Sequence, residues 1–163
     1  MNRDFWRSRN NEFRFPQTMK MKIIRMEHNK HLPEYKTEGS SGMDLHAAIK
    51  KEITLKPLER VLVPTGIKIE IPVEYEAQIR ARSGLSVKHG ITLINAVGTV
   101  DADYRGEVCV GLVNLSNEEY TIKPEDRIAQ MVIAKVEKAE IEVTTELATS
   151  TRGEGGFGST GFN

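Results

Sequence analysis

Several segments of the chain combine glycine, charged and hydroxyl residues in ways that a β-sheet core does not require. The first, Arg82-Ser83-Gly84, ends one apparent strand and opens a predicted helix. A guanidinium, a hydroxyl and the free amides of a helix N-terminus together make an oxyanion-binding site. A capped helix with a surface arginine explains the same three residues, so the tripeptide alone leaves both interpretations open.

A second segment, from Asn95 to Gly106, is typical of a hairpin with a carboxylate-rich arm. In extended backbone Asp101 and Asp103 point to one face of the strand and Tyr104 to the other. A carboxylate beside a phosphate can accept a proton from an attacking water. The alternative is a polar turn with two solvated aspartates.

Two further segments lie nearer the C-terminus. Asp126 and Arg127 enter a predicted strand and can pair locally, although an exposed ion pair contributes only ~0–1 kcal/mol. The run from Arg152 to Gly161 has five glycines in ten residues. Its backbone amides can approach a phosphate closely, and Phe157 can stack on a flat base. A disordered Gly-rich tail is the alternative.

Other catalytic chemistries have less support. His28 and His31 lie beside Pro33, where no helix aligns them, and the remaining histidines are far away in the sequence, so we do not expect a zinc site. Ser83 has no neighbouring general base for covalent catalysis. Cys109 is the single cysteine, which excludes an internal disulfide, and it lies in the most apolar predicted strand as a small core residue.

The composition indicates one soluble domain. The 163 residues are enough for an independent core. The 23 basic and 23 acidic side chains cancel, so no overall field draws the protein to nucleic acid or to an acidic membrane. No apolar stretch approaches the ~20 residues that span a bilayer, and residues 1–20 lack the apolar region of a signal peptide. We therefore expect a cytoplasmic protein with no membrane partner, and nucleic-acid binding is not expected.

Short β-rich segments bounded by proline and glycine must position these residues. The predicted strands are Ile53–Leu55, Val61–Val63, Ile67–Ile71, Val108–Leu115, Tyr120–Ile122, Met131–Ile133 and Ile141–Val143. The run at 108–115 is nearly continuous in apolar residues, as expected for a strand covered on both faces. One short helix is expected from Ser83 to His89, with Ser83 as its cap and Gly90 as its end. The pattern predicts an all-β sandwich or barrel with one short helix.

Together, these segments resemble the five ordered motifs of the trimeric dUTPase family. The motifs are Ser41–Ala47, Arg82–Ser86, Asn95–Glu107, Glu125–Met131 and Arg152–Gly161. The chain departs from the family pattern at three places: Ser41 replaces a usual alanine, Ala81 a common proline and Glu125 a common glycine. None of these departures removes a group that is expected to do chemistry. The match runs from about Met21 to the end of the chain, and five motifs in this order are specific.

The resemblance implies a jelly-roll-like (β-clip) subunit of a homotrimer, with active sites that are each assembled from more than one chain. It implies hydrolysis of dUTP to dUMP and pyrophosphate by Mg²⁺-assisted attack of water on the α-phosphorus. That reaction limits uracil in DNA and supplies dUMP for dTMP synthesis. The corresponding division of the chain is a flexible extension at 1–20, a β-domain at 21–148 and a mobile Gly-rich lid at 149–163.

The resemblance also assigns residues to the substrate. Asp101 holds the 3′-hydroxyl and orients the attacking water. The contacts to uracil and deoxyribose fall on Asn95, Gly98, Thr99, Val100, Tyr104 and Cys109. The triphosphate contacts fall on Arg82, Ser83, Gly84 and Gln130, with Arg152, Ser159 and Thr160 at the terminal phosphates and Phe157 closed over uracil. Mg²⁺ bridges phosphate oxygens and keeps several waters. Asp44 either touches those waters or braces a neighbouring arginine.

Three other functions are alternatives to dUTP hydrolysis. A dCTP deaminase of the same superfamily is expected to carry serine where Gly84 stands, and a glutamate near the base. A catalytically reduced regulatory or binding protein of this fold has no need of Asp101, Arg82, Gln130 and Arg152 together. A nucleic-acid-binding role rests only on the Arg-rich residues 1–20.

Overall fold

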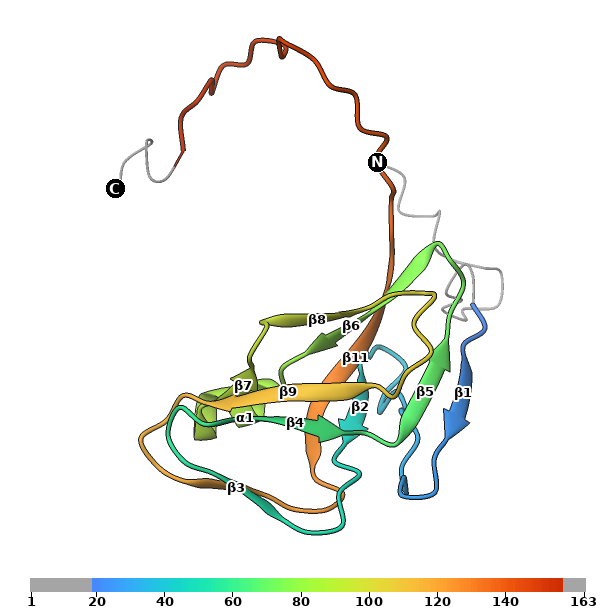
Figure 1. The fold of residues 1–163 in the computed structure, drawn as a ribbon, viewed down its shortest axis with the longest axis vertical. Helices are drawn as coiled ribbons and strands as arrows, with labels where there is room; N and C mark the ends of the chain where they lie inside the picture. Colours follow the sequence, from blue (N-terminus) through green and yellow to red (C-terminus); the bar gives the residue numbers. More distant parts are fainter. Residues whose placement is uncertain (1–18, 157–163) are drawn as a thin grey trace.

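The computed structural model describes residues 19–156. Within that range the chain forms eleven strands and one short helix (Figure 1). In chain order they are β1 (Lys22–Arg25), β2 (Met43–His46), β3 (Ile53–Leu55), β4 (Arg60–Pro64), β5 (Ile67–Glu70), β6 (Tyr75–Arg80), α1 (Ser83–His89), β7 (Ile91–Leu93), β8 (Val97–Val100), β9 (Cys109–Asn114), β10 (Tyr120–Ile122) and β11 (Arg127–Lys135).

The strands pair antiparallel in two larger and two smaller sheets. The four-stranded sheet has the order β2-β11-β6-β8, and the three-stranded sheet has the order β4-β9-β7. The pairs β1-β5 and β3-β10 add two short ladders at the periphery of the domain (Figure 1). This arrangement confirms the predicted all-β sandwich with a single short helix. Within residues 19–156, no helix has the length and apolar character that crossing a membrane would need.

The core lies between the sheets and follows the alternation of the strands. In β2 and β5 every second side chain is buried, including Leu45 and Ile67. In β9 burial becomes continuous toward its end, where Leu112, Val113 and Asn114 are all buried. The prediction that this strand is covered on both faces is therefore confirmed for its C-terminal half. The expected strands at 53–55 and 120–122 also form, and they pair with each other.

Two local predictions at the ends of the fold were wrong. Residues 141–143 form no strand: β11 ends at Lys135, and the chain then leaves the body of the domain (Figure 1). The side chains of Ile141 and Val143 are 89% and 94% exposed, because this segment pairs with none of the described strands. The cap of α1 is Arg82 and not Ser83. Arg82 keeps the extended backbone of the preceding strand, and no side chain caps the helix. The helix ends at Gly90 as predicted, with a left-handed φ of 67°.

The segment from Asn95 to Gly106 does not form the predicted hairpin, because it contains a single strand, β8. β7 pairs with β9, whereas β8 pairs with β6, so the two strands belong to different sheets. Between them Ala96 adopts a positive φ of 59°, which turns the chain from one sheet to the other. Beyond β8 the backbone is not extended either, because the amide of Tyr104 donates to the carbonyl of Asp101 across a turn at 3.1 Å. Local sequence signalled the turn residues but not the sheet that each strand would join.

Gly66 lies in the short turn between β4 and β5, where a larger residue is expected to destabilise the fold. Gly66 has a φ of +68°, and a Cβ at this position would lie 2.6 Å from the Cβ of Asn29. Gly66→Ala therefore combines left-handed strain with overpacking, and we expect a loss of about 2–4 kcal/mol in the free energy of unfolding. Denaturant unfolding of both proteins measures it. Gly39→Ala is the matched control, because nothing lies within 4 Å of its position. An equal effect of the two substitutions would contradict the steric account.

Candidate active site

A carboxylate between two guanidiniums forms the centre of the site. Asp44 on β2 contacts Arg82, which precedes α1, with 3.2 Å between Oδ1 and Nε. Its other oxygen, Oδ2, lies 3.2 Å from a terminal nitrogen of Arg127, the first residue of β11. β2 and β11 pair antiparallel and place His46 opposite Arg127 and Asp44 opposite Gln130. The sheet register thus unites three segments that are more than 35 residues apart in the chain.

The expected local pair of Asp126 with Arg127 was wrong. Asp126 instead accepts a hydrogen bond at 2.8 Å from the backbone amide of Lys123 and closes the turn before β11. Arg127 turns to Asp44. Since both oxygens of Asp44 are engaged by arginines, the contacts favour the bracing role of this carboxylate over direct metal contact.

Gln130 is held beside the N-terminal end of α1. Its side-chain amide donates to the carbonyl of Ala81 at 3.0 Å. Gly42 makes this placement possible, because a Cβ there would lie 2.5 Å from Oε1 of Gln130. Ser83 and Gly84 at the start of α1 are exposed, and no atom lies within 4 Å of where a Cβ of Gly84 would be. Amides, a hydroxyl, an amide side chain and a guanidinium are therefore available on one surface.

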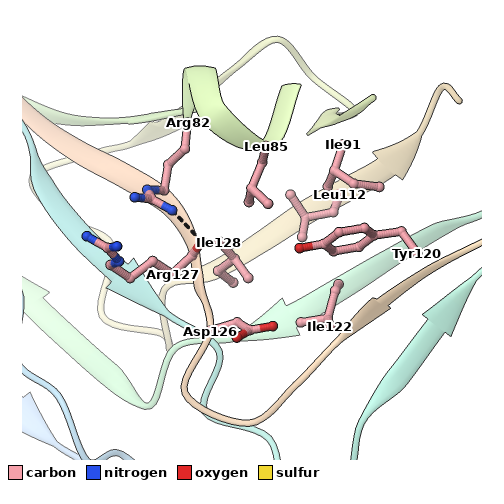
Figure 2. Close-up of a pocket in the computed structure, with 9 residues that line it drawn as sticks. All are labelled: Arg82, Leu85, Ile91, Leu112, Tyr120, Ile122, Asp126, Arg127 and Ile128. Carbon is pink, nitrogen blue, oxygen red and sulfur yellow. Dashed lines mark hydrogen bonds between the residues drawn. The ribbon is translucent and has the colours of Figure 1, made fainter. Parts of the chain in front are cut away.

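A cavity of about 190 Å³ adjoins this cluster. Figure 2 shows Arg82 and Arg127 on one side of it, with the hydroxyl of Tyr120 directed toward its interior. Burial raises the pKa of Tyr120, so this hydroxyl stays protonated. The apolar lining is formed by Leu85, Ile91, Leu112, Ile122 and Ile128. The cavity lining includes the guanidiniums of Arg82 and Arg127 and the carboxylate of Asp126. Asp44 contacts both guanidiniums, so the site offers hydrogen-bond donors to an anionic ligand and carries no excess positive charge.

The nucleoside residues expected from the sequence lie on β8 and the loop after it. Asn95, Thr99 and Asp101 are exposed, and Gly98 and Cys109 are half-buried. Val100 is buried. Tyr104 is 46% exposed, which excludes a core tyrosine. Its hydroxyl donates to the carbonyl of Glu107 at 3.0 Å. The same hydroxyl would lie only 2.2 Å from a Cβ at position 106, so this arrangement requires Gly106.

Within one chain, the two ends of this segment lie at different distances from the phosphate cluster. β8 pairs with β6 so that Val100 lies opposite Ala77 and Val97 opposite Arg80. Asp101, which follows Val100, thus lies near the end of β6 that is far from Arg82. Along the backbone, Ala77 and Arg82 are five residues apart, which is roughly 16 Å at ~3.3 Å per residue.

The tail residues are likewise apart from the cluster. Arg152 is exposed on the segment that leaves the body (Figure 1), and its Nε donates to the carbonyl of Gly155 at 2.9 Å. Phe157, Ser159 and Thr160 lie outside the described residues. The structure therefore joins the first, second and fourth predicted motifs. It places β8 of the third motif in the same sheet, with Asp101 at the end far from Arg82, and leaves Arg152 of the fifth motif apart.

Comparison with known proteins gives the family. The family model described as dUTPase matches residues 28–161. The chain belongs to the dUTPase family. The deoxyuridine 5′-triphosphate nucleotidohydrolase of Finegoldia magna is 60% identical over 144 residues, which cover 88% of this chain and 100% of the relative. That of Fusobacterium nucleatum is 58% identical over 143 residues, 88% of this chain and 97% of the relative. The resemblance seen in the motifs is confirmed.

Solved dUTPases share the fold. The dUTPase of Staphylococcus bacteriophage 80alpha with dUPNHPP has a TM-score of 0.80 and 26% identity, and the match covers 88% of this chain and 99% of that chain. A mutant dUTPase from phage phi11 of S. aureus, whose structure shows the coordination of a structural Mg(II) ion, has a TM-score of 0.72 and 21% identity, with 80% and 99% covered.

Sequence reasoning missed the role of the histidines in this dUTPase. The rings of His31 and His46 stack with 4.5 Å between their centroids, and His28 lies 3.2 Å from a carboxylate oxygen of Glu107. These pairs join loops and strands distant in the sequence, so no local spacing could reveal them. Among residues 19–156, no group of three or more His, Cys, Asp and Glu side chains is arranged to hold a metal ion.

The stacked pair predicts a pH dependence of stability. Burial, followed by the charge of His31, lowers the pKa of His46 below its ordinary 6.5. The folded dUTPase therefore binds this proton less tightly than the unfolded chain. Its contribution is full above pH 6.5, the pKa in the unfolded chain, and is lost as the pH falls from there through the lower pKa of the folded state. We expect His46→Gln to lose less Tm than wild type between about pH 8 and about pH 5.5. Equal losses of Tm would show that His46 is not responsible.

Proposed function

We propose that this dUTPase hydrolyses dUTP at sites shared between the chains of a homotrimer, with Asp101 as general base and the Asp44–Arg82–Arg127 cluster at the phosphates. As a member of its family, the chain is a dUTP diphosphatase that releases dUMP and pyrophosphate. The observation that carries the shared site is the distance of roughly 16 Å along β6 between the Asp101 end of β8 and Arg82. A second chain must supply Asp101 to the phosphates that Arg82 holds.

The phosphate subsite consists of Arg82, Ser83, Gly84 and Gln130. Arg82 is oriented before substrate arrives, since Asp44 holds its Nε and the carbonyl of Arg127 accepts from its terminal nitrogen at 3.0 Å. The carboxylates of Asp44 and Asp126 balance the charges of Arg82 and Arg127, so the subsite offers fixed hydrogen-bond donors to the triphosphate and no net charge. Donors that are fixed in advance stabilise developing charge without reorganising, which is the main electrostatic contribution to catalysis.

The nucleoside subsite lies along Asn95 to Cys109. Uracil presents acceptor, donor and acceptor groups, and backbone groups of this segment can match them as a strand partner would. A close backbone wall leaves no room for the methyl group of thymine. The exposed ring of Tyr104 lies under the deoxyribose, where a ribose 2′-hydroxyl would clash.

In the proposed reaction Asp101 does two tasks. Its carboxylate holds the 3′-hydroxyl and accepts a proton from a water molecule. The oxygen of that water forms a bond to the α-phosphorus, and the bond from the α-phosphorus to the bridging oxygen of pyrophosphate breaks. The negative charge that passes to the leaving pyrophosphate is neutralised by Arg82 and by donors on Ser83 and Gln130. No covalent enzyme intermediate is needed, so positioning supplies much of the rate.

Mg²⁺ is the proposed cofactor. The described residues offer no carboxylate cage, which fits an ion that is bound mainly by phosphate oxygens and waters. Asp44 would reach such an ion only through water, because both of its oxygens contact arginines. When bound, Mg²⁺ would neutralise phosphate charge and fix the geometry of the triphosphate.

The segment beyond β11 supports the shared site. Ile141, Val143 and Leu147 are 89%, 94% and 87% exposed, and burying apolar surface is worth about 25 cal/mol per Å². We propose that this arm packs on a neighbouring chain and delivers Arg152, Phe157, Ser159 and Thr160 to its site. Residues 149–163 would then be a lid that orders over substrate, residues 21–148 the body, and residues 1–20 an extension. The enzyme is proposed to be cytoplasmic.

Pyrophosphate release from dUTP, dTTP, dCTP and UTP, measured in parallel with Mg²⁺, tests the substrate assignment, and the mass in solution tests the trimer. We expect rapid release from dUTP alone and a particle of three chains. Comparable release from dTTP would contradict the backbone wall, and comparable release from UTP would contradict the contact of Tyr104. Ammonia release from dCTP would favour the deaminase alternative, and no reaction with any nucleotide would favour a regulatory protein. An active monomer would contradict the shared site.

A further inference from the structure

Glu107 anchors the loop that carries Asp101 and Tyr104 to the rest of the domain. One carboxylate oxygen accepts a hydrogen bond from the amide of Gly66 at 2.7 Å and lies 3.2 Å from Nε2 of His28. The side chains of Glu107 and His28 are only 22% and 29% exposed. The backbone carbonyl of the same glutamate accepts from the hydroxyl of Tyr104. A single residue therefore links the tyrosine to the β4–β5 turn.

The residues next to Gly66 and His28, which contact Glu107, are held in place by further hydrogen bonds. Asn29 is 4% exposed, and its amide nitrogen donates to the carbonyl of Thr65 at 2.7 Å and to that of His31 at 2.9 Å. The hydroxyl of Thr65 donates in turn to the carbonyl of Val108 at 2.5 Å. We name residues 28–31 the clasp. Through Asn29 the clasp holds the β4–β5 turn, and through His28 it reaches Glu107.

We propose that Glu107 is a positioning residue for Tyr104, and through it a determinant of selection against the ribose 2′-hydroxyl. The inference rests on the proposed function, because it takes the contact of Tyr104 with deoxyribose from there. The loop from 101 to 106 has no ladder partner of its own among the described strands. The backbone of Tyr104 is held only by groups of the same loop, Asp101 and Arg105. Its side chain is placed by the hydroxyl bond to Glu107 and by packing on Gly106.

Removing the carboxylate would leave the amide of Gly66 without its acceptor and His28 without its partner. The backbone at 107 would then be free to shift, and the carbonyl that orients Tyr104 would shift with it. A displaced ring selects less well between sugars, because exclusion of a hydroxyl depends on close contact. The side chain of Glu107 contacts no substrate in this arrangement, so it acts through Tyr104.

The test compares Glu107→Ala and Glu107→Gln with wild type in kcat/KM for dUTP divided by kcat/KM for UTP. Both values come from one preparation, so the fraction of folded enzyme cancels in the ratio. We expect Glu107→Ala to lower the ratio about tenfold, within the ~100-fold that a 1 Å misplacement can cost. Glu107→Gln keeps an oxygen for the amide of Gly66 and should restore most of the ratio. Lys22→Ala, which removes an exposed ion pair with Glu70, should leave it unchanged.

Tyr104→Ala separates the inference from the function on which it rests. If its ratio stays at the wild-type value, the sugar contact of Tyr104 is wrong and the inference fails with it. If Tyr104→Ala lowers the ratio and Glu107→Ala does not, the inference alone is overturned. A lower Tm for Glu107→Ala with an unchanged ratio also overturns it, because Glu107 would then be only structural. A lowered ratio in Glu107→Ala that Glu107→Gln fails to restore would overturn the role of the bond to Gly66.

Discussion

Asp101→Asn is expected to bind dUTP with nearly the Kd of wild type and to lose about 10²- to 10⁴-fold in kcat, the usual contribution of general acid–base catalysis. The amide has the shape of the carboxylate and can still hold a 3′-hydroxyl, but it cannot take a proton from water. Calorimetric titration with a non-hydrolysable dUTP analogue and steady-state release of pyrophosphate measure the two quantities separately.

The matched control for this variant is Asp103→Asn. Asp103 lies two residues further along the same loop, is exposed and has no proposed contact with substrate. The Asp103→Asn variant changes the charge by the same amount, so it reports the general effect of losing one negative charge near the phosphates. Equal kcat in Asp101→Asn and wild type would remove Asp101 from the mechanism. Equal loss in both variants would point to net charge instead of proton transfer.

Deletion of residues 152–163 is expected to leave a folded trimer and to lower kcat/KM for dUTP by about 100-fold or more, since the lid supplies an arginine, an aromatic ring and two hydroxyls that hold the substrate. Residues 152–156 make no described hydrogen bond with the body of the domain, so Tm and oligomer mass should not change. Thermal unfolding, light scattering and pyrophosphate release measure the three properties on one preparation.

A shorter deletion, of residues 162–163 alone, is the control because it leaves the fifth motif complete. Full activity of the longer deletion would show that the tail is not a lid. Loss of the trimer in the longer deletion would mean that the tail holds subunits together, and activity could then not be assigned to closure over substrate.

The parts of the fold that the sequence predicted are those set by short-range pattern. Ser83 to His89 was predicted as a helix because its end is marked by Gly90, and the strand at 120–122 because it is a short β-rich segment. The pairing of β2 with β11 could not be predicted in this way, because the two strands are far apart in the sequence. It joins Asp44 to Arg127, and only the packed sandwich decides that register. The motifs identified which residues matter, and the structure identified the ion pairs among them.

The failures have the same physical origin. The alternation at 141–143 is a real strand signal, but a strand needs an edge to pair with, and these residues pair with none of the described strands. The stacking of His31 on His46 could not be read from the sequence, because a loop and most of β2 separate the two residues. Asp126 and Arg127 are neighbours in sequence, but Asp126 belongs to the turn before β11 and Arg127 begins the strand, so each contacts a different partner.

The arm that leaves the body after Lys135 has a consequence for mixtures of defective chains. Suppose one chain carries Asp101→Asn and keeps its tail, while another lacks the tail and keeps Asp101. Neither chain forms a working enzyme by itself. Where the loop and the tail of one site come from different chains, a trimer that contains both kinds includes a site with both parts intact. Two inactive proteins would then complement each other after unfolding and reassembly together, whereas simple mixing of preformed trimers would restore nothing.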